Sequence, residues 1–443
     1  MEIRIPKDAK SIIDKLTEAG YEAYIVGGCV RDCLLGLTPD DWDITTNALP
    51  GQVKELFRRT IDTGIEHGTV TVMIGNEGYE ITTYRTDGAY SDGRHPDKVT
   101  FVPSLEEDLK RRDFTINAMA YNDRDGLVDL FGGRDDIEKK TIRCVGCADE
   151  RFSEDALRMM RAVRFAAKLG YGIDEEAITS IKKLAPTLSK VSAERITVEL
   201  TKLLLSDHPE MIETLYETGL TKVFFPELDK AYETPQVHPH HCYNVGKHIE
   251  ESVRASKNDR IVRFAMLLHD IGKPETLTVD DKGITHFRGH PEISARMGEE
   301  IMRRWKLDND TIFRVCRLVR HHDMGIGRTF TPQLVRKAVS VMEDDFPKLM
   351  EVMRADVLAQ SDYMRQEKLD TIDRYAREYE RIMNEGECCS LKTLAVGGRD
   401  LIELGIKPGP IMGEILGKLL ERVLEDPSMN DRDKLLSIAK KYI

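Results

Sequence analysis

The sequence predicts an α+β protein, with a small mixed β-sheet near the N-terminus and helices in most of the remaining chain. Two observations support this fold class. Residues 1–150 alternate short β-rich runs with helical patterns, whereas later residues repeat apolar side chains every three or four positions. The 443 residues are 41% apolar and 32% charged, which suits about two to four globular domains with polar surfaces.

Three segments of residues 1–150 are expected to build the sheet. "EAYIVGG" (22–28) reads as an apolar strand that ends at two glycines, and "DKVTFV" (97–102) reads as another strand. "HGTVTVMIGNEGYEITTYR" (67–85) reads as a hairpin that turns at residues 75–78. The segment "TDGAYSDGRHPD" (86–97) is rich in Gly, Asp and Ser, so we expect a mobile loop there.

Two amphipathic helices are predicted directly after the sheet. "SEDALRMMRAVRFAAKLG" (153–170) reads as one continuous helix that stops at Gly170. "VSAERITVELTKLLL" (191–205) reads as a second helix with Ser192 as its N-cap. We therefore predict four regions, which are a sheet-containing head at 1–150, a helical neck at 151–235, a helical domain at 236–365 and a helical tail at 366–443.

The overall composition excludes several classes of protein. No apolar run reaches the roughly 20 residues of a membrane helix, and the first residues lack the apolar core of a signal peptide. Eight cysteines in a chain of this size do not make a disulfide framework. A cytoplasmic protein is expected. The net charge of −12 argues weakly against a nucleic-acid partner. One predicted helix face nevertheless carries four positively charged side chains, those of Arg158, Arg161, Arg164 and Lys168.

The first candidate site combines carboxylates with glycines. Asp41 and Asp43 alternate in "DDWDITT" (40–46), which reads as a strand, so both carboxylates should share a face and could hold Mg²⁺. Upstream, Gly27 and Gly28 would let backbone N–H groups approach a triphosphate, and Arg31 would add fixed positive charge.

Four motifs in this order resemble those of the class II tRNA nucleotidyltransferases, the CCA-adding enzymes. "GGCVRD" with "DDWDIT" resembles their motif A, and "KRRDFTINAMA" (110–120) resembles the next motif. "EDALRMMR" (154–161) resembles the nucleotide-recognition motif, and "SAERITVE" (192–199) resembles the element that stabilises it. The resemblance implies a DNA polymerase beta-like head. It also implies template-independent addition of CCA to the 3′ end of tRNA from CTP and ATP, with Mg²⁺ as cofactor and pyrophosphate as leaving group.

The resemblance also implies a role for each matching residue. The triphosphate would contact Gly28 and Arg31, and the metal ions would bind Asp41 and Asp43. The remaining nucleotide contacts would come from Arg112, from Asp113 at the ribose hydroxyl, from Asp155 and Arg158 at the base edge, and from Glu154, Arg161 and Arg164 nearby.

The base-edge role has a physical rationale. Cytosine and adenine both carry an exocyclic amine beside an acceptor ring nitrogen, which a carboxylate and a guanidinium can bind together. On one continuous helix, Asp155 and Arg158 would lie side by side at i,i+3. The plain alternative is an ordinary helical salt bridge.

A second candidate site is a series of histidines and aspartates in the third region. Its order resembles the HD superfamily of metal-dependent phosphohydrolases. The expected ligands of a transition metal such as Ni²⁺ or Mn²⁺ are His248, His269, Asp270 and Asp356, with His290 and His321 as further candidates. A phosphate ester such as a 2′,3′-cyclic phosphate is the expected substrate, and a purely structural role is the alternative.

Two other functions stay open at this point. Bacterial poly(A) polymerases share the head motifs but carry a Gly-Arg-Arg-Phe-type signature where this chain has "DTGIEHGTVTV" (62–72). The other is an HD phosphohydrolase whose head only binds RNA. The complete segment at 85–97, with Arg94 inside it, favours addition of all three nucleotides, although an A-adding specialist remains an alternative. "GIKPGPIMGEIL" (405–416) could be a helix-hairpin-helix turn or a plain connector.

Overall fold

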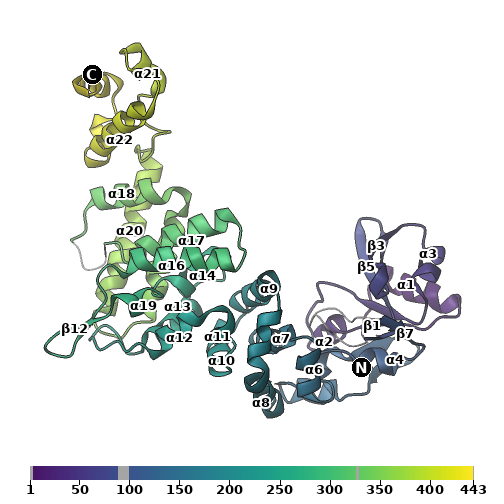
Figure 1. Cartoon of the computed structure of the whole chain (residues 1–443). Coiled ribbons are helices and arrows are strands. Elements are labelled where there is room, and N and C mark those ends of the chain that lie inside the picture. Colours follow the sequence, from purple (N-terminus) through teal and green to yellow (C-terminus); the bar gives the residue numbers. More distant parts are fainter. Residues whose placement is uncertain (1–2, 88–98, 326–328, 443) are drawn as a thin grey trace. The chain divides into compact units, whose positions relative to one another are not determined.

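The computed structural model describes residues 3–87, 99–325 and 329–442 (Figure 1). The chain forms two compact units that meet in sequence between Pro226 and Glu227, and each unit is described by itself. The predicted boundary between the neck and the third region, at 235/236, lies nine residues after this division and stays a prediction. Arg94 and most of its loop lie outside the described residues, so that expectation stays a prediction.

A seven-stranded mixed sheet is the centre of the first unit, as the alternating pattern predicts. The strand order is β3-β4-β5-β2-β1-β8-β9, and within this sheet β2 and β5 form the parallel pair. The strands are β1 Ala23–Val26, β2 Ile44–Thr46, β3 Thr60–Gly64, β4 Thr69–Ile74, β5 Glu77–Thr83, β8 Met119–Asn122 and β9 Gly126–Asp129. Two short pairs lie outside it, namely β6 Arg85–Asp87 with β7 Val99–Phe101, and β10 Thr141–Ile142 with β11 Gly172–Ile173.

Alternating side chains of β1 are buried on both faces of the sheet. Ile25 packs into the main core with the apolar side of α1, whereas Tyr24 and Val26 pack into a smaller core that includes Leu109 of α4. This explains why β1 is a continuous apolar run rather than an alternating one. The helices of this part are α1 Lys7–Glu18, α2 Gly28–Leu34, α3 Pro50–Leu56, α4 Leu105–Lys110 and α5 Gly133–Glu138 (Figure 1).

The predicted hairpin is confirmed, although its turn is shorter than expected. Ile74 pairs with Glu77, so only Gly75 and Asn76 form the loop between β4 and β5. Gly75 has φ +61°, a value that glycine adopts without strain. Glu77 and Gly78 belong to β5 because both still pair with β4.

The helix predicted over 153–170 is two helices, and this expectation was wrong in one respect. α6 ends at Glu154 and α7 begins at Leu157, because Asp155 has φ −140° and ψ 105°. The end of α7 is confirmed, since Gly170 takes a left-handed conformation with φ +65°. The helices of this part are α6 Ala148–Glu154, α7 Leu157–Leu169, α8 Glu175–Leu184, α9 Ala193–Leu204, α10 Ile212–Glu217 and α11 Thr221–Phe224. Ser192 is the N-cap residue of α9, but its side chain makes no capping hydrogen bond.

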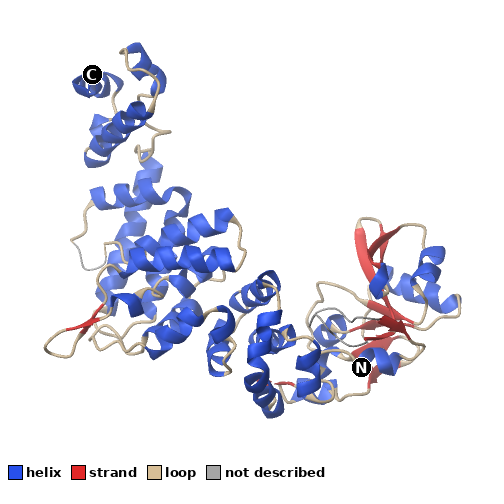
Figure 2. Cartoon of the chain, viewed as in Figure 1, coloured by secondary structure: helices blue, strands red, loops and turns tan. Residues whose placement is uncertain are grey.

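The second unit is almost entirely helical (Figure 2). Its helices are α12 Pro226–Glu233, α13 Val245–Ala255, α14 Arg260–Leu268, α15 Lys273–Thr276, α16 His290–Arg304, α17 Asn309–His321, α18 Pro332–Met342, α19 Phe346–Leu358, α20 Arg365–Glu385, α21 Gly398–Glu403, α22 Pro410–Glu425 and α23 Arg432–Ala439. The expectation of helices alone needs one correction, because β12 Thr278–Val279 and β13 Thr285–His286 form a small hairpin. Across the described segments, no helix is long and apolar enough to cross a membrane.

The helices of the second unit pack in two groups of different size. α20 packs against α18 and α19, so the first helix after residue 365 belongs with the helices before it. α21, α22 and α23 enclose a separate core around Leu401, Leu419 and Leu435. Residues 404–409 join α21 to α22, and α22 includes the rest of the 405–416 segment; both alternatives for this turn stay open. The proposed boundary between the third region and the tail stays a prediction.

Candidate functional site

Asp41 and Asp43 lie at the edge of the sheet, immediately before β2. The expectation that both belong to the strand was wrong, because β2 begins at Ile44. The chain is still held against β1, since the backbone N–H of Val26 donates to the Asp43 carbonyl at 3.0 Å. Both carboxylates are exposed, and Trp42 between them packs toward the main core. The alternation that the sequence predicts therefore holds although the strand assignment does not.

A third carboxylate, Glu80, accompanies them. Parallel pairing of Ile44 with Ile81 brings residue 80 of β5 beside Asp43. The surrounding protein raises the pKa of Asp43 by desolvation; Arg112 opposes this rise, and Glu80 and Asp41 add to it. Three oxygen-donor groups whose negative charges repel one another fit a divalent cation such as Mg²⁺. Sequence reasoning missed Glu80, because its position depends on a pairing between distant strands.

Gly27 allows a close approach that no other residue would permit. It has φ +83°, and a Cβ built there would lie 2.9 Å from Nη1 of Arg112. The Arg112 guanidinium therefore lies against the turn between β1 and α2. This brings a positive charge, the N-terminal backbone of α2 and the carboxylate of Asp43 into one region.

Arg31 lies deeper than the sequence suggested. Its side chain is buried, with Nε 2.8 Å from Asp32 Oδ1 and Nη1 2.5 Å from Asn117 Oδ1. The guanidinium also lies over the ring of Phe165. In this structure, Arg31 ties α2 to the segment after α4 and to α7, and Gly28 lies above it at the start of α2.

Asp113 connects the head to the helical neck. Its carboxylate accepts hydrogen bonds from Arg161 at 2.8 and 2.6 Å and from Asn117 at 3.2 Å. Burial alone would raise the pKa of Asp113, but Arg161 and Arg158 outweigh it and lower that pKa to about 2. Asp113 is therefore ionised at neutral pH and holds Arg161 in place.

α9 supplies the partners of the other arginines in α7. Glu199 accepts from Nε of Arg164 at 2.9 Å, and Arg161 Nη1 lies 3.7 Å from the same carboxylate. Glu199 and Arg164 are both buried, so this pair is shielded from solvent. The motif at 192–199 was expected to stabilise the recognition helix, and these contacts agree with that expectation.

Asp155 and Arg158 are close in sequence but do not form the ion pair with each other that was the plain alternative to base reading. Asp155 accepts from the backbone N–H of Leu157 at 3.0 Å and from Arg195 at 2.7 Å. Arg158 instead pairs with Glu154 and donates to the Arg111 carbonyl at 3.2 Å. Because a carboxylate and a guanidinium each have more bonding sites than these contacts use, both can still meet a ligand.

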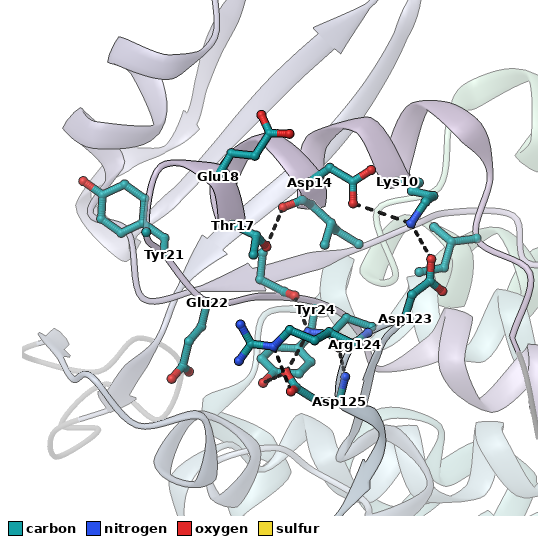
Figure 3. Close-up of a pocket in the computed structure, with 15 residues that line it drawn as sticks. Lys10, Asp14, Thr17, Glu18, Tyr21, Glu22, Tyr24, Asp123, Arg124 and Asp125 are labelled. Atoms are coloured by element: carbon teal, nitrogen blue, oxygen red, sulfur yellow. Dashed lines mark hydrogen bonds and ion pairs between the residues drawn. The ribbon is translucent and has the colours of Figure 1, made fainter.

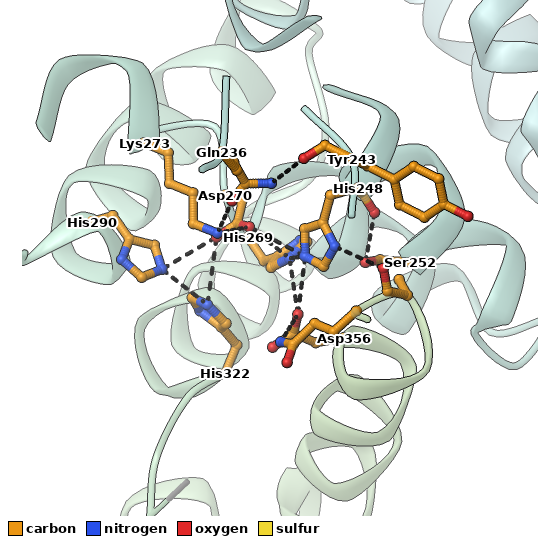
Figure 4. A network of polar contacts seen from close by, with 12 residues as sticks. Gln236, Tyr243, His248, Ser252, His269, Asp270, Lys273, His290, His322 and Asp356 are labelled. Carbon is orange, nitrogen blue, oxygen red and sulfur yellow. Dashed lines mark hydrogen bonds and ion pairs between the residues drawn. The ribbon is translucent and has the colours of Figure 1, made fainter. Parts of the chain in front are cut away.

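The second candidate site is a cluster of four imidazoles and two carboxylates, all of them buried except His290, which is partly buried (Figure 4). His248 Nε2 lies 3.0 Å from Asp356 Oδ1 and 3.2 Å from His269 Nε2. His290 Nε2 lies 3.3 Å from His322 Nε2. Asp270 lies between the two histidine pairs. Its Oδ2 is 3.3 Å from both His248 and His269, and its Oδ1 is 3.2 Å from His290.

The outer ring nitrogens fix the tautomers of these histidines. Each Nδ1 lies near a backbone carbonyl oxygen, at distances of 3.3 Å for His248, 2.7 Å for His269, 2.8 Å for His290 and 2.7 Å for His322. Since a carbonyl can only accept, each Nδ1 carries the proton and each Nε2 presents its lone pair to the cluster. Two nitrogen lone pairs that face one another at 3.2–3.3 Å repel, and a proton or a metal cation between them removes this repulsion.

The donor set therefore fits metal ions of the transition series. Neither carboxylate oxygen of the buried Asp270 accepts a hydrogen bond of good geometry, although Lys273 Nζ lies 2.6 Å from Oδ2. Two groups of ligand atoms are close enough to hold an ion, namely His248, His269 and Asp356, and His269, Asp270 and His322. Imidazole with carboxylate suits Ni²⁺, Mn²⁺ or Fe²⁺.

One predicted ligand is replaced by its neighbour. His321 lies outside the cluster, whereas the adjacent His322 is buried inside it. The sequence "RHHD" (320–323) offers both rings, and only the orientation at the end of α17 decides which one points inward. Burial and the neighbouring His269 and His290 lower the pKa of His322, which keeps its ring neutral.

A hollow in the head is lined by residues of α1, of β1 and of the turn between β8 and β9 (Figure 3). It is beside the N-terminal end of β1, whereas Asp43 is beside the C-terminal end. Its charged groups satisfy one another: Lys10 pairs with Asp123, and Asp125 accepts from Tyr24 at 2.8 Å and from Arg124 at 3.1 Å. We assign no ligand to it.

Three family models match the chain. They are described as the poly A polymerase head domain at residues 23–143, a probable RNA and SrmB-binding site of polymerase A at 170–232, and tRNA nucleotidyltransferase domain 2 at 277–439.

Similar proteins match along nearly the whole chain. A CCA-adding enzyme of Ligilactobacillus salivarius is 37% identical over 440 residues, covering 99% of this chain and 96% of that protein. A CCA-adding enzyme of Lactobacillus delbrueckii is 39% identical over 96% of this chain and 95% of that protein. The crystal structure of the Bacillus stearothermophilus CCA-adding enzyme in complex with CTP has a TM-score of 0.71 at 30% identity, with coverage of 98% and 97%.

Proposed function

The chain belongs to the family of CCA-adding enzymes, and on that premise we propose that it adds CCA to the 3′ end of tRNA from CTP and ATP without a nucleic-acid template. The single observation that carries this proposal is the group of Asp41, Asp43 and Glu80 beside the Gly27–Arg112 contact. Full-length similarity to CCA-adding enzymes favours this function over a poly(A) polymerase or an RNA-binding head. A tRNA substrate implies that the enzyme acts in the cytoplasm.

The transfer reaction needs positive charge near the attacking hydroxyl and near the leaving phosphates. The 3′-oxygen of the RNA bonds to the α-phosphorus, the bond to the β-phosphate oxygen breaks, and pyrophosphate leaves. Mg²⁺ ions, when bound to Asp41, Asp43 and Glu80, would supply Lewis acidity toward the hydroxyl and the leaving phosphates. Arg112 at the glycine turn neutralises negative charge on the triphosphate, and the exposed backbone of Gly28 allows a close approach.

Base choice is assigned to the start of α7. We propose that Asp155 accepts a hydrogen bond from the exocyclic amine of cytosine or adenine while Arg158 donates to the adjacent ring nitrogen. Uracil and guanine present a carbonyl to the carboxylate and are repelled. Asp113, Arg161, Arg164 and Glu199 hold this helix in position.

Removing a carboxylate tests the transfer site. We expect Asp41→Ala and Asp43→Ala each to lose essentially all nucleotide addition, because neither remaining pair of carboxylates can hold both ions. Asp40→Ala removes a neighbouring exposed carboxylate and is the matched control. Addition of CMP by either variant at a rate near wild type would refute the assignment.

A second function is favoured by the buried cluster in the other unit. We propose that His248, His269, Asp270, His290, His322 and Asp356 hold one or two transition-metal ions for hydrolysis of a phosphate ester, such as a 2′,3′-cyclic phosphate. Water bonds to phosphorus, one ring P–O bond breaks, and the departing oxygen takes a proton to give a monoester. The inward lone pairs and the bridging position of Asp270 support this proposal.

Two assays test the second function. Purified protein should contain more Ni²⁺, Mn²⁺ or Fe²⁺ than the His269→Ala/Asp270→Ala double variant. It should also hydrolyse 2′,3′-cyclic AMP with added Ni²⁺ or Mn²⁺, while the double variant should not. Equal metal content and no hydrolysis in either protein would leave this cluster with a structural role only.

A further inference from the structure

The His-Asp cluster opens into a cavity of about 630 Å³. The buried ligands form one part of its lining, and residues of α20 and of the segment before α13 form another. Among the second group are Lys368 and His240, which are both half-buried and which neither proposed function uses.

Lys368 forms no direct ion pair with a carboxylate in the described part of the chain; burial lowers its pKa, and the charge of Asp356 opposes that change. Its Nζ lies 3.0 Å from Nδ1 of His240 and 2.5 Å from Oε1 of Gln360, and both of these are neutral acceptors. Burial, Lys368 and His238 lower the pKa of His240, so its ring stays neutral and can accept. In contrast, the positive charge of Lys273 in the same cavity is neutralised by Asp270 at 2.6 Å.

The geometry leaves one donor available for a ligand. An ammonium group has three N–H bonds, and only two of those of Lys368 are used by the protein. Because Nδ1 of His240 accepts, its other ring nitrogen carries the proton, and the backbone of Tyr363 accepts a hydrogen bond from this ring. The His240 ring is fixed by stacking on His238 at 4.9 Å and by edge contact with Tyr363 at 4.9 Å. This arrangement is rigid before any ligand binds.

Gln360 sets the separation from the metal ligands. Its Nε2 donates to Asp356 Oδ1 at 3.0 Å while its Oε1 accepts from Lys368. The amide group of Gln360 therefore bridges Lys368 to Asp356, a carboxylate of the cluster. A nucleotide would bridge the two places with its ribose, which carries one phosphate on the 3′ oxygen and another on the 5′ oxygen.

We propose that Lys368, held in place by His240 and Gln360, forms a second phosphate-binding subsite, so that the cavity takes nucleotide ends with one phosphate at the metal cluster and another at Lys368. This rests on the proposed phosphohydrolase function and names its substrate class. An RNA end qualifies because the phosphate that links its last nucleotide supplies the second charge. A nucleoside with a single cyclic phosphate leaves the subsite empty.

Calorimetric titration of the full chain loaded with Mn²⁺ tests the subsite directly. The probes are uridine 3′-phosphate and uridine 3′,5′-bisphosphate, in an Asp41→Ala/Asp43→Ala background that weakens binding in the head. The wild-type cavity should bind the bisphosphate about tenfold or more tightly than the monophosphate. Lys368→Met should abolish this preference and leave monophosphate affinity unchanged. Arg374→Met removes an exposed positive charge further along α20 and should keep the preference.

Each other outcome overturns the proposal. Equal affinity of the two probes in the wild type, weak binding of both, or a preference that survives Lys368→Met would each do so. A loss of affinity for both probes in Lys368→Met would mean that Lys368 only positions Gln360 and Asp356. Hydrolysis of 2′,3′-cyclic AMP is scored separately. A bisphosphate preference without hydrolysis would refute the phosphohydrolase function alone, and hydrolysis without the preference would refute the subsite alone.

Discussion

Asp155 and Arg158, the proposed base-reading pair, are each held by protein partners. Arg195 and the N–H of Leu157 hold the Asp155 carboxylate, while Glu154 and a backbone carbonyl hold the Arg158 guanidinium. A base edge would therefore meet two side chains whose rotamers are already restricted. A hydrogen-bonding site whose side chains are ordered before binding is selective, because a wrong base leaves their buried polar groups without hydrogen-bond partners.

Truncation of either residue should impair base choice more than catalysis. We expect Asp155→Ala and Arg158→Ala to lower the ratio of kcat/KM for CTP over UTP about tenfold or more, because a matched pair of hydrogen bonds discriminates by about 1–3 kcal/mol. Glu150→Ala removes an exposed carboxylate from α6 and is the control. Steady-state kinetics with all four nucleotides measures the effect. Unchanged ratios in both variants would exclude base reading by this pair.

Asp113 should contribute to stability in a pH-dependent way. Its pKa is lowered to about 2 in the folded protein, so its stabilising effect is fully present above the ordinary pKa near 4. That effect is lost as pH falls from about 4 toward 2. Asp113→Asn should therefore reduce the free energy of unfolding by about 2 kcal/mol at pH 7, and the difference should shrink below pH 4. Urea denaturation of both proteins from pH 3 to 7 measures it, and a difference that grows at low pH would contradict the assignment.

Residue-level expectations failed where the outcome depended on tertiary structure. Glu80 becomes a neighbour of Asp43 only through parallel pairing of β5 with β2, which local sequence does not encode. The choice of His322 over His321 depends on the direction of the ring at a helix end. By contrast, Asp41 and Asp43 could be recognised because their spacing and the preceding glycines are local features.

At the scale of elements, the break between α6 and α7 is a tertiary effect. The stretch around Asp155 contains neither Gly nor Pro, and its Ala, Leu, Met, Arg and Glu residues are good helix formers. The non-helical conformation of Asp155 is accompanied by its bonds to Arg195 of α9 and to the N–H of Leu157. Such contacts override local propensity, so one continuous helix was the natural prediction.

The pairing of α7 with α9 should be essential to the neck. Glu199→Gln leaves the buried Arg164 without its counter-ion, and loss of one partner of a buried pair costs about 3 kcal/mol. Glu194→Gln, which alters an exposed residue of the same helix, should change the free energy of unfolding by less than about 0.5 kcal/mol. Chemical denaturation followed by circular dichroism compares the two. Equal stability would show that α9 does not hold α7 through this carboxylate.

At the scale of the whole molecule, periodicity was sufficient for the architecture. Alternating and 3–4-residue patterns predicted the mixed sheet and the helical remainder. The sequence did not predict that α20 packs against the helices before it. Its composition does not distinguish such a helix from one that begins a new region.

The two proposed activities should be separable, because their residues lie in different compact units. His269→Ala/Asp270→Ala should abolish hydrolysis of 2′,3′-cyclic AMP while CCA addition stays within about twofold of wild type. Asp41→Ala should show the opposite pattern. Circular dichroism confirms that each variant is folded. Loss of both activities in a folded single-site variant would contradict independence.

The most direct test of the central claim is extension of a tRNA that ends at its discriminator base. The protein is incubated with Mg²⁺ and labelled CTP, ATP, UTP or GTP, singly and in pairs, and the products are sized by electrophoresis. CTP alone should add two nucleotides, CTP with ATP should add three and then stop, and UTP or GTP should add essentially none. A long adenosine tail, a product limited to one adenosine on a tRNA that already ends in CC, or no extension at all would contradict the account.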